Sequence, residues 1–242
     1  MRDRMSGRTI LRGSALSKGF GSGTRRIEVV RNLDLEVEAG SFTLIKGPSG
    51  CGKSTLLAML AGLTQPDGGE VWIGDTDVWA LPRGQRDRLR LNRMGFIFQG
   101  AVLFPALAAR EQVALILTEM GRPRGEALAT ADEALAAVGL ADRAHLLPAA
   151  LSGGEKQRVA IAMGLAKRPS LIFADEPTSA LDTENAGAVA RLLTSYAAAV
   201  GAAVLCVTHD DRLQPFADRV LFMRAGRIEA EQIIKEPKRC HS

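Results

Sequence analysis

Apolar and polar residues alternate near the start of the chain, and this spacing predicts strands. The alternation covers residues 27–30 and 33–37, where every second side chain can face a core while the others face water. The glycine-containing stretch 21–23 predicts a turn between segments, and residues 70–73 continue the strand pattern. This part of the chain is therefore expected to consist of strands and turns.

Short, wholly apolar runs further along the chain predict strands that are buried on both faces, as in a parallel sheet. These runs lie at residues 41–45, 94–98, 171–174, 203–207 and 220–223. Helical spacing of apolar residues separates them after Leu151 and also marks residues 54–63. Strands that alternate with helices in this order predict an α/β fold with a parallel sheet.

The middle of the chain has a different pattern, rich in Ala, Leu and Glu at helical spacing. It runs from about 108 to 149 and is interrupted at residues 121–123 and at Gly139, where helices are expected to end. We therefore expect a helical insertion within the α/β fold. The polar tail from Glu231 is expected to fray.

Composition narrows the class of protein. A chain of 242 residues can bury a sizeable core and suits one large domain or one with an inserted subdomain. An apolar content of 46% and a charged content of 24% are ordinary for a soluble globular protein. Cys51, Cys206 and Cys240 show no CxxC spacing, which argues against a zinc site or a disulfide framework and fits a reducing cytoplasm.

Charge gives only weak support for nucleic acid as a partner. The net charge is +4, from 31 basic and 27 acidic residues, and nucleotide phosphates or lipid headgroups attract the same charge. The densest basic cluster has Arg86, Arg90 and Arg93 on one helical face, but no aromatic residues interleave with it. A solvated helix face is therefore the favoured interpretation, and no nucleic-acid partner is expected.

No stretch of the sequence has the length of a membrane span. The longest apolar run, residues 196–207, contains 12 residues, whereas a bilayer needs about 20. The first eight residues are charged and no signal-like apolar core follows them. If the protein works at a membrane, we expect another chain to supply the span.

The most specific motif is a phosphate loop. It matches the pattern G-x-x-x-x-G-K-[ST] without a mismatch, between a predicted strand and a predicted helix. Glycines let backbone N–H groups turn inward around an anion, and the helix N-terminus adds its positive end. Lys53 is expected to reach the β- and γ-phosphates, and the Ser54 hydroxyl to bind Mg²⁺. The motif consists of Gly47, Pro48, Ser49, Gly50, Cys51, Gly52, Lys53 and Ser54.

Two adjacent carboxylates follow the apolar run 171–174. Asp175 and Glu176 stand at the predicted carboxyl end of a strand, where α/β sheets place their ligands. Asp175 is expected to hold Mg²⁺ through water, and Glu176 to orient or deprotonate a water that attacks the γ-phosphate. An acidic turn before Pro177 is the alternative, which the phosphate loop makes less favoured.

Residues 152–155 contain a second motif at a predicted helix start. The S-x-x-E spacing from Ser152 to Glu155 is that of a helix capping box. Capping alone does not require Gly153 and Gly154, whereas a Ser and two Gly at a helix N-terminus also form an anion-binding nest. The chain is therefore expected to carry two surfaces that face phosphate, at 47–54 and at 152–154.

These motifs together identify a family by resemblance. The order of residues 47–54, Gln99, 151–155, 175–176, 179–182 and 208–210 closely resembles the nucleotide-binding subunit of an ATP-binding-cassette (ABC) transporter. The resemblance covers about residues 10 to 228 and implies a P-loop NTPase (RecA-like) core with an N-terminal antiparallel β part and an inserted helical subdomain. It implies a single domain at 9–236, with the core at about 9–98 and 155–236, the helical subdomain at about 99–154, and polar tails at 1–8 and 237–242.

The resemblance also implies roles for individual residues. Gln99 is expected to sense Mg²⁺ and the attacking water, and His209 to contact the γ-phosphate and support that water. Ser152 and Gly154 are expected to contact the γ-phosphate bound by the other subunit of a head-to-tail dimer, with Asp182 crossing the interface. The resemblance assigns Lys53, Gln99, Glu176 and His209 to catalysis, Ser54, Gln99 and Asp175 to the metal, and Thr55 and Gly153 to nucleotide binding.

Two positions depart from the pattern that the family usually shows. Phe20 stands where an aromatic residue, more often Tyr, stacks on adenine; a core Phe at a strand end is the alternative. Met163 stands on the helix after 151–155 where the family usually has Arg. This second departure bears on coupling or stability rather than on nucleotide chemistry.

The resemblance implies a peripheral ATPase on the cytoplasmic face of the inner (plasma) membrane. Residues 104–113 and 208–212 look like the branch that serves lipoprotein release, macrolide efflux and glycolipid or haem export. There the subunit pairs with a separate permease of four transmembrane helices, often with a periplasmic adaptor. A permease surface is expected beside Gln99, at Val102, Leu103, Phe104 and Leu107; the alternative is that these side chains pack in the helical subdomain's core.

Other functions remain as alternatives at this point. The nearest is a non-transporting ABC ATPase that signals through its permease, as in the cell-division branch. A DNA-repair or translation ATPase would share the motifs but usually adds a coiled coil, zinc cysteines or a second cassette. A P-loop small-molecule kinase has no use for the Ser152–Gly154 motif.

Overall fold

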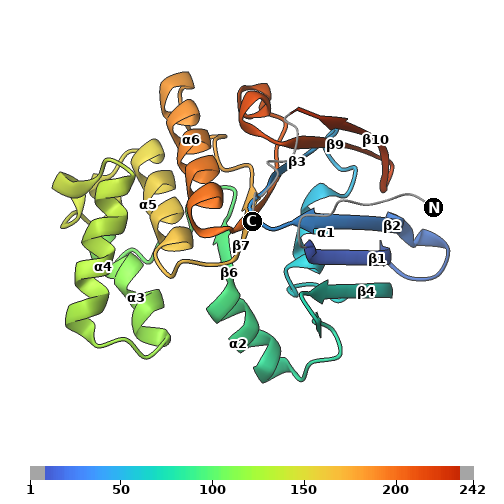
Figure 1. Ribbon diagram of the computed structural model, residues 1–242, viewed down its shortest axis with the longest axis horizontal. Coiled ribbons are helices and arrows are strands. Elements are labelled where there is room, and N and C mark those ends of the chain that lie inside the picture. Colours follow the sequence, from blue (N-terminus) through green and yellow to red (C-terminus); the bar gives the residue numbers. More distant parts are fainter. Residues whose placement is uncertain (1–8, 235–242) are drawn as a thin grey trace, which may run out of the picture.

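The computed structural model describes residues 9–234 and shows two sheets with helices between and beside them (Figure 1). One sheet is antiparallel, with the strand order β2 (Ile27–Glu38), β1 (Thr9–Phe20), β4 (Gly68–Ile73) and β5 (Thr76–Asp77). The other has the order β10 (Arg227–Ile233), β9 (Arg219–Arg224), β3 (Phe42–Lys46), β8 (Ala203–Val207), β7 (Leu171–Asp175) and β6 (Met94–Ile97). Strands β9, β3, β8, β7 and β6 run parallel, and β10 pairs antiparallel with β9.

Six α-helices and four 3₁₀ turns complete the described part of the chain. The helices are α1 (Lys53–Leu60), α2 (Arg83–Arg93), α3 (Ala109–Glu119), α4 (Arg124–Ala137), α5 (Gly153–Leu165) and α6 (Thr183–Val200). The 3₁₀ turns are η1 (Gly23–Arg25), η2 (Ala141–Arg143), η3 (Pro148–Ala150) and η4 (Asp211–Phe216). Among residues 9–234, none of the helices combines the length and the apolar character that crossing a bilayer demands.

The parallel sheet is buried on both faces because successive side chains of its strands enter two different cores. In β8, Ala203, Leu205 and Val207 face the core around α1, whereas Val204 and Cys206 face the core with α5 and α6. This arrangement requires apolar residues at every position of the strand. The continuous apolar runs in the sequence therefore predicted these strands correctly.

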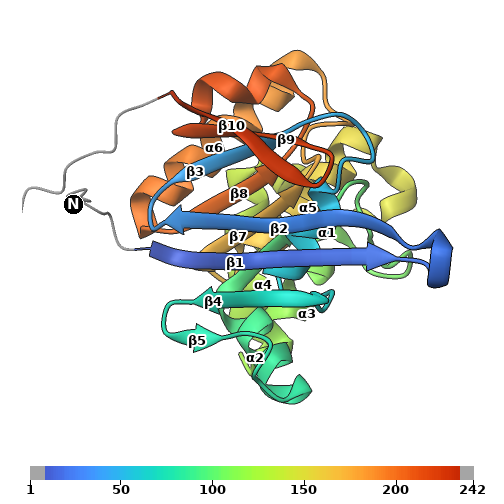
Figure 2. The same cartoon turned by 90° about the vertical axis from the view of Figure 1, so that its right-hand side faces the viewer.

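The antiparallel sheet lies on the far side of α1 from the helices α5 and α6, as Figures 1 and 2 show. Helix α1 contacts β1 and β2 of one sheet and β7 and β8 of the other. Helices α3, α4 and α5 pack on one another at the opposite side of the molecule (Figure 1). The fold is that of a P-loop NTPase with an antiparallel part, as the sequence predicted; the division into subdomains at residues 99 and 154 stays a prediction.

Some predicted elements have different bounds in the structure. The two predicted strands at 27–30 and 33–37 form one strand, β2, with Asn32 in a left-handed conformation (φ +43°) between them. The helix predicted at 54–63 ends at Leu60, and Gly62 follows with φ +67°. Left-handed glycine is a common helix terminator because it has no Cβ.

The predicted fraying from Glu231 is wrong for residues 231–233. These residues belong to β10, where Glu231 pairs with Leu221 and Ile233 with Arg219. A polar sequence still forms this strand because β10 is the outermost strand of its sheet and its side chains are mostly exposed. The predicted tails at 1–8 and 237–242, the end of the domain at 235–236, and Cys240 lie outside the described residues.

The prediction of a solvated arginine face on α2 is wrong for two of its three residues. The guanidinium of Arg86 lies 4.5 Å from the centre of the Trp79 ring. Arg90 donates a hydrogen bond of 2.6 Å to the carbonyl of Gly62. Both arginines therefore attach α2 to the protein body, and the missed signal was Trp79, which precedes the helix in the sequence.

Candidate functional site

The predicted site residues follow neighbouring strands of the parallel sheet. The phosphate loop follows β3, His209 follows β8, and Asp175 and Glu176 lie at the end of β7. Because β3 pairs with β8 and β8 with β7, these segments meet at one edge of the sheet. Gln99 follows β6, the next strand along. The carboxyl edge of a parallel sheet is where α/β folds bind ligands.

The phosphate loop depends on glycine at two close backbone approaches. A Cβ on Gly47 would lie 2.0 Å from the carbonyl oxygen of Met223, and one on Gly52 would lie 2.4 Å from that of Val29. Gly52 also has φ +104°, a conformation that side-chain-bearing residues rarely adopt. Lys53 is buried, and its Nζ donates to the carbonyls of Gly47 (2.8 Å) and Pro48 (3.0 Å).

The loop is therefore wrapped around the ammonium group of Lys53 at the start of α1. Such a cationic loop at a helix N-terminus attracts phosphate. Cys51 is buried within the loop, and its Sγ would lie 3.0 Å from a Cβ on Gly47. Cys51 therefore acts as a small packing residue inside the loop.

Ser54 and Asp175 are brought together as the sequence predicted. The Ser54 hydroxyl lies near enough to the Asp175 carboxylate to affect its pKa, while the Asp175 Oδ1 atom is buried without a hydrogen-bond partner among the described residues. Burial raises the pKa of Asp175, the Ser54 hydroxyl lowers it, and the nearby Glu176 carboxylate raises it. A hydroxyl and a carboxylate with a free oxygen are ligands that suit Mg²⁺.

Glu176 is held by three donors from the segment after β8. The hydroxyl of Thr208 donates to Glu176 Oε2 (2.8 Å), and the backbone N–H of His209 donates to Oε1 (3.1 Å). The His209 ring completes the contact, with Nδ1 2.7 Å from Oε1. The carboxylate is thus fixed in direct contact with the imidazole, although the His209 side chain is 74% exposed and the Glu176 side chain only 11%.

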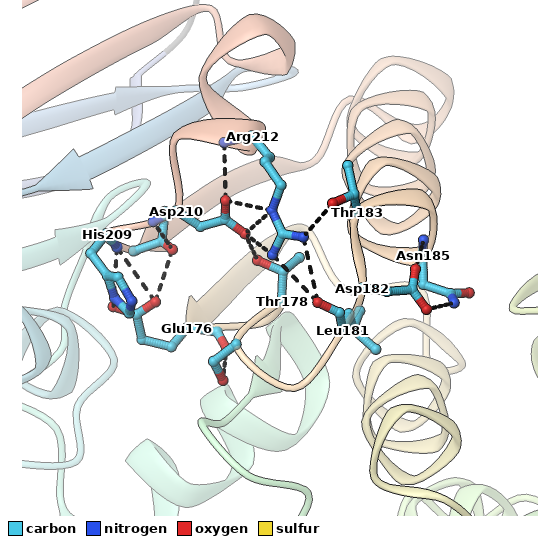
Figure 3. Close-up of polar contacts among 11 residues, drawn as sticks. Glu176, Thr178, Leu181, Asp182, Thr183, Asn185, His209, Asp210 and Arg212 are labelled. Carbon is cyan, nitrogen blue, oxygen red and sulfur yellow. Dashed lines mark hydrogen bonds and ion pairs between the residues drawn. The ribbon is translucent and has the colours of Figure 1, made fainter.

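The backbone at Glu176 has an unusual conformation. Its φ is +48°, and its N–H donates to the carbonyl of Val207 on the neighbouring strand. A left-handed conformation costs a non-glycine residue about 1–2 kcal/mol, and such residues gather at functional sites. The turn directs the Glu176 side chain toward Thr208 and toward His209, as Figure 3 shows.

A second network beside this contact was missed by the sequence analysis. Arg212 binds Asp210 with two parallel hydrogen bonds, from Nε to Oδ1 and from Nη2 to Oδ2, each 2.8 Å long (Figure 3). The hydroxyl of Thr178 donates to the same Asp210 carboxylate at 2.7 Å. Although partial burial raises the pKa of Asp210, the bonds from Arg212 and Thr178 lower it to about 2.

Arg212 also reaches the segment that carries Asp182. Its guanidinium nitrogens lie 3.4 and 3.5 Å from the carbonyl oxygen of Leu181, and one of them lies 3.5 Å from the hydroxyl of Thr183. The loop after β8 and the loop before α6 are therefore joined through one side chain (Figure 3). The sequence held a signal for the pair of Asp210 and Arg212, which are opposite charges two residues apart in a short turn, but not for the contact with Leu181.

Ser152 and Asp182 both cap helices. The Ser152 hydroxyl accepts from the N–H of Glu155 (3.2 Å), and Glu155 Oε2 accepts from the N–H of Ser152 (2.8 Å), which is the predicted capping box at α5. Asp182 caps α6 by accepting from the N–H of Asn185 (2.8 Å). Ser152 and Gly153 are exposed, and a Cβ on Gly153 would meet no atom within 4 Å, so this helix start is open to a ligand.

The structure does not bring all of the predicted residues together. Among residues 9–234, no hydrogen bond or ion pair joins Ser152, Gly153 or Gly154 to the phosphate loop, and none joins the exposed Gln99 to Ser54 or Asp175. Figure 1 shows α5 with the helical layer and α1 beyond the parallel sheet. Phe20 ends β1 with its side chain 49% exposed.

Three features define the class of protein as a nucleotide-hydrolysing P-loop protein. They are the phosphate loop, the two carboxylates at the end of a strand, and the histidine that contacts the second carboxylate. Comparison with known families makes this class more specific. The family model described as "ABC transporter" matches residues 30–179. The chain therefore belongs to the ABC transporter family, as one of its ATP-binding domains.

Relatives cover most of the chain. It is 39% identical over 222 residues to the lipoprotein-releasing system ATP-binding protein LolD of Syntrophotalea carbinolica, which covers 92% of this chain and 98% of that protein. It is 40% identical over 214 residues to HrtA of Staphylococcus haemolyticus, provisionally named a hemin import ATP-binding protein. That match covers 88% of this chain and 96% of HrtA. The macrolide export ATP-binding/permease protein MacB of Marinobacter nauticus is 39% identical over 224 residues, which are 93% of this chain but 35% of MacB.

A solved structure agrees with the fold. The ATP-binding cassette MJ0796, described as a dimeric post-hydrolysis state bound to ADP and Pi, has a TM-score of 0.89 and 34% identity. The match covers 94% of this chain and 100% of that one. The chain is thus an ATP-binding subunit of a transporter, and it is an ATPase.

Proposed function

We propose that this ATPase drives the export of a lipid-like or hydrophobic substrate through a separate membrane permease, from the cytoplasmic face of the membrane. The names of LolD and MacB, which refer to lipoprotein release and macrolide export, support this proposal. The name of HrtA, which refers to hemin import, supports a hydrophobic substrate but not the direction. A periplasmic adaptor belongs to the proposal, and a signalling role through the permease is its alternative.

In the proposed reaction, water attacks the γ-phosphate of ATP and yields ADP and phosphate. Lys53 binds the β- and γ-phosphates, and Glu176 orients the water and accepts its proton. The proton acceptor is kept in place by Thr208 and His209, whose contacts with the Glu176 carboxylate are 2.7–3.1 Å. Ser54 and Asp175 would hold Mg²⁺, which neutralises phosphate charge, and Gln99 would complete that site.

The open helix start at Ser152 supports a site that two chains share. It has the features of a phosphate-binding nest, yet it belongs to the helical layer, and within the described residues it makes no hydrogen bond to the phosphate loop of its own chain. We infer that Ser152, Gly153 and Gly154 contact the nucleotide bound by a second copy, with Asp182 at the same interface. The dimeric state of MJ0796 supports this inference.

The observation that carries the permease proposal is the exposure of apolar side chains just after Gln99. Phe104 is 57% exposed and Val102 is 76% exposed. Leu103 and Leu107 are half-buried, and Leu103 packs against the core. The alternative that Phe104 belongs to the core of the helical layer is therefore wrong, and an exposed apolar surface of this kind suggests a partner.

The fold holds Phe104 outward. The side-chain amide of Gln112, which is fully buried in α3, accepts from the N–H of Phe104 (3.1 Å) and donates to its carbonyl (2.6 Å). With its backbone fixed on α3, Phe104 presents its ring to solvent. A hollow of about 270 Å³ that includes Phe98, Val102 and Met163 lies in the same region and completes an apolar surface for the permease.

Co-purification with the permease tests this proposal. The chain is co-expressed with a candidate permease of four transmembrane helices, as wild type and as Phe104→Asp. We expect the substitution to reduce co-purification while ATP affinity and thermal stability stay near wild type. Val200→Asp is the matched control, because Val200 is 50% exposed at the end of α6, and it should co-purify like wild type. Normal co-purification of Phe104→Asp would place the docking surface elsewhere.

A further inference from the structure

Asp67 makes an unusually complete set of contacts with the tip of the β1–β2 hairpin. It lies in the loop between α1 and β4. Its Oδ1 accepts from Lys18 Nζ (2.8 Å), and its Oδ2 accepts from the N–H of Gly19 (2.8 Å) and from Arg26 Nη2 (2.7 Å). Its own N–H donates to the carbonyl of Ser17 (2.8 Å). One residue thus joins the end of β1 to Arg26, the residue that precedes β2.

These contacts surround Phe20, the residue that follows Gly19. The Lys18 ammonium lies 5.7 Å from the centre of the Phe20 ring, so a side chain bound by Asp67 also contacts the ring. The hydrogen bonds from Lys18 and from the Gly19 N–H lower the pKa of Asp67, which keeps the carboxylate charged. Removing that charge would release Lys18 and Arg26, two like charges that it holds together.

The same hairpin end lies against the phosphate loop. Gly19 pairs with Glu28, and the next residue, Val29, places its carbonyl oxygen 2.4 Å from where a Cβ on Gly52 would stand. Phe20 pairs with Ile27 just beyond this approach and is 49% exposed. A half-exposed aromatic residue is therefore paired with Ile27, two residues from the point where the hairpin touches the phosphate-binding segment at Val29.

We propose that Asp67 is a positioning residue for the adenine ring of ATP: it fixes Lys18, Gly19 and Arg26 and thereby holds Phe20 where the base stacks. This inference rests on the proposed role of Phe20. Asp67 touches no part of the nucleotide and acts only through the hairpin. Its substitution therefore weakens the interaction with the base and leaves the interaction with the phosphates unchanged.

The test compares ATP with inorganic tripolyphosphate, which has the phosphates but lacks the base. Dissociation constants of both are measured by calorimetry for wild type, Asp67→Asn, Phe20→Ala and the double variant. Aromatic stacking contributes about 1 kcal/mol, which corresponds to a roughly fivefold change in affinity. We expect each single variant to lose ATP affinity by about that factor, with unchanged tripolyphosphate affinity, and the double variant to lose no more than Phe20→Ala alone.

Two controls keep the outcome specific. Asp75→Asn removes an exposed carboxylate from the other end of the same sheet and should bind ATP like wild type. If Asp67→Asn lowers the melting temperature strongly, Arg26→Gln removes one contact of the same carboxylate and is measured instead. An ATP affinity of Phe20→Ala equal to wild type would refute the role of Phe20 itself.

A different result would refute the positioning role of Asp67 but not the stacking role of Phe20. If Phe20→Ala weakens ATP binding but Asp67→Asn does not, Phe20 stacks on adenine without help from Asp67. Equal losses of ATP and tripolyphosphate affinity in Asp67→Asn, or additive losses in the double variant, would also overturn the inference, because both show an effect that does not pass through the ring.

Discussion

At the scale of single residues, the site is a set of side chains whose partners come from neighbouring strand ends. Glu176 belongs to the end of β7, and its contacts Thr208 and His209 follow β8. The two segments are more than thirty residues apart in the chain, at separations of 32 and 33. The motifs predicted roles for Glu176 and His209 separately, but the contact between the two side chains follows from the strand order and could not be predicted from the motifs.

Asp67 and Arg212 show what sequence reasoning missed at this scale. The partners of Asp67 lie 41 to 49 residues earlier in the chain, and nothing in the polar turn around it distinguishes it from a solvated carboxylate. Arg212 reaches Leu181, 31 residues away. Long-range contacts of this kind leave no local spacing pattern, so a single sequence cannot show them.

The pKa of Asp210 leads to a prediction about acid stability. Because this pKa falls from an ordinary 3.8 to about 2 in the folded chain, the ionised carboxylate stabilises the fold above pH 4, and this contribution is lost as the pH falls from about 4 to about 2. We expect Asp210→Asn to lower the free energy of unfolding at pH 6 by about 1–2 kcal/mol.

Urea unfolding between pH 6 and pH 3 measures this effect. The gap between wild type and Asp210→Asn should be largest at pH 6 and should narrow below pH 4. Asp142→Asn, at an exposed position in η2, is the control and should follow wild type throughout. A gap that stays constant from pH 6 to pH 3 would show that the Asp210 charge does not stabilise the fold.

At the scale of elements, the buried strands were predicted best and the edges worst. Apolar runs marked β3, β7, β8 and β9 because a strand covered on both faces leaves no place for polar side chains. Strand β10 has a polar sequence and was missed, since its position at the edge removes that constraint. Helix α2 has no fully buried residue; Leu89 packs against the core, and two arginines, Arg86 and Arg90, also attach the helix to the protein body.

The packing of α5 on β6 gives a prediction at this scale. A Cβ on Gly95 of β6 would lie 2.4 Å from the carbonyl oxygen of Gly164 in α5, and backbone atoms cannot move away without shifting the helix. We expect Gly95→Ala to lower the free energy of unfolding by about 1–3 kcal/mol. Gly84→Ala is the control, because a Cβ there meets no atom within 4 Å and alanine favours the helix.

Chemical denaturation of the two variants tests this packing. Gly84→Ala should be as stable as wild type or up to about 1 kcal/mol more stable. If Gly95→Ala is as stable as wild type, α5 can move away from β6 without cost, and the close approach of Gly95 to Gly164 does not contribute to the stability of the fold.

At the scale of the whole molecule, one chain carries the two surfaces that are proposed to face phosphate, and they lie in different layers. The phosphate loop lies at the edge of the parallel sheet, and Ser152 opens the helix α5 of the helical layer. A single chain does not bring these surfaces together. That both surfaces bind phosphate stays a prediction from the sequence, whereas their separation within one chain is a property of the fold.

The central claim is that each ATPase site is shared between two chains. Chains with Lys53→Ala lack a working phosphate loop, and chains with Ser152→Arg place a bulky cation at the open helix start. Each variant is inactive in the proposed arrangement, because both of its sites carry a lesion. In a mixed dimer, however, the intact phosphate loop of one chain meets the intact Ser152 of the other, and one of the two sites contains neither lesion.

The most direct measurement is the ATPase rate of the two inactive variants after mixing at equal concentrations, with heterodimers verified by different affinity tags. Half of the dimers formed by random pairing are mixed, and each has one intact site, so we predict recovery of roughly a quarter of the wild-type rate. Lys53→Ala chains mixed with differently tagged Lys53→Ala chains should recover none. A mixture that contains verified heterodimers and still hydrolyses no ATP would contradict the shared site.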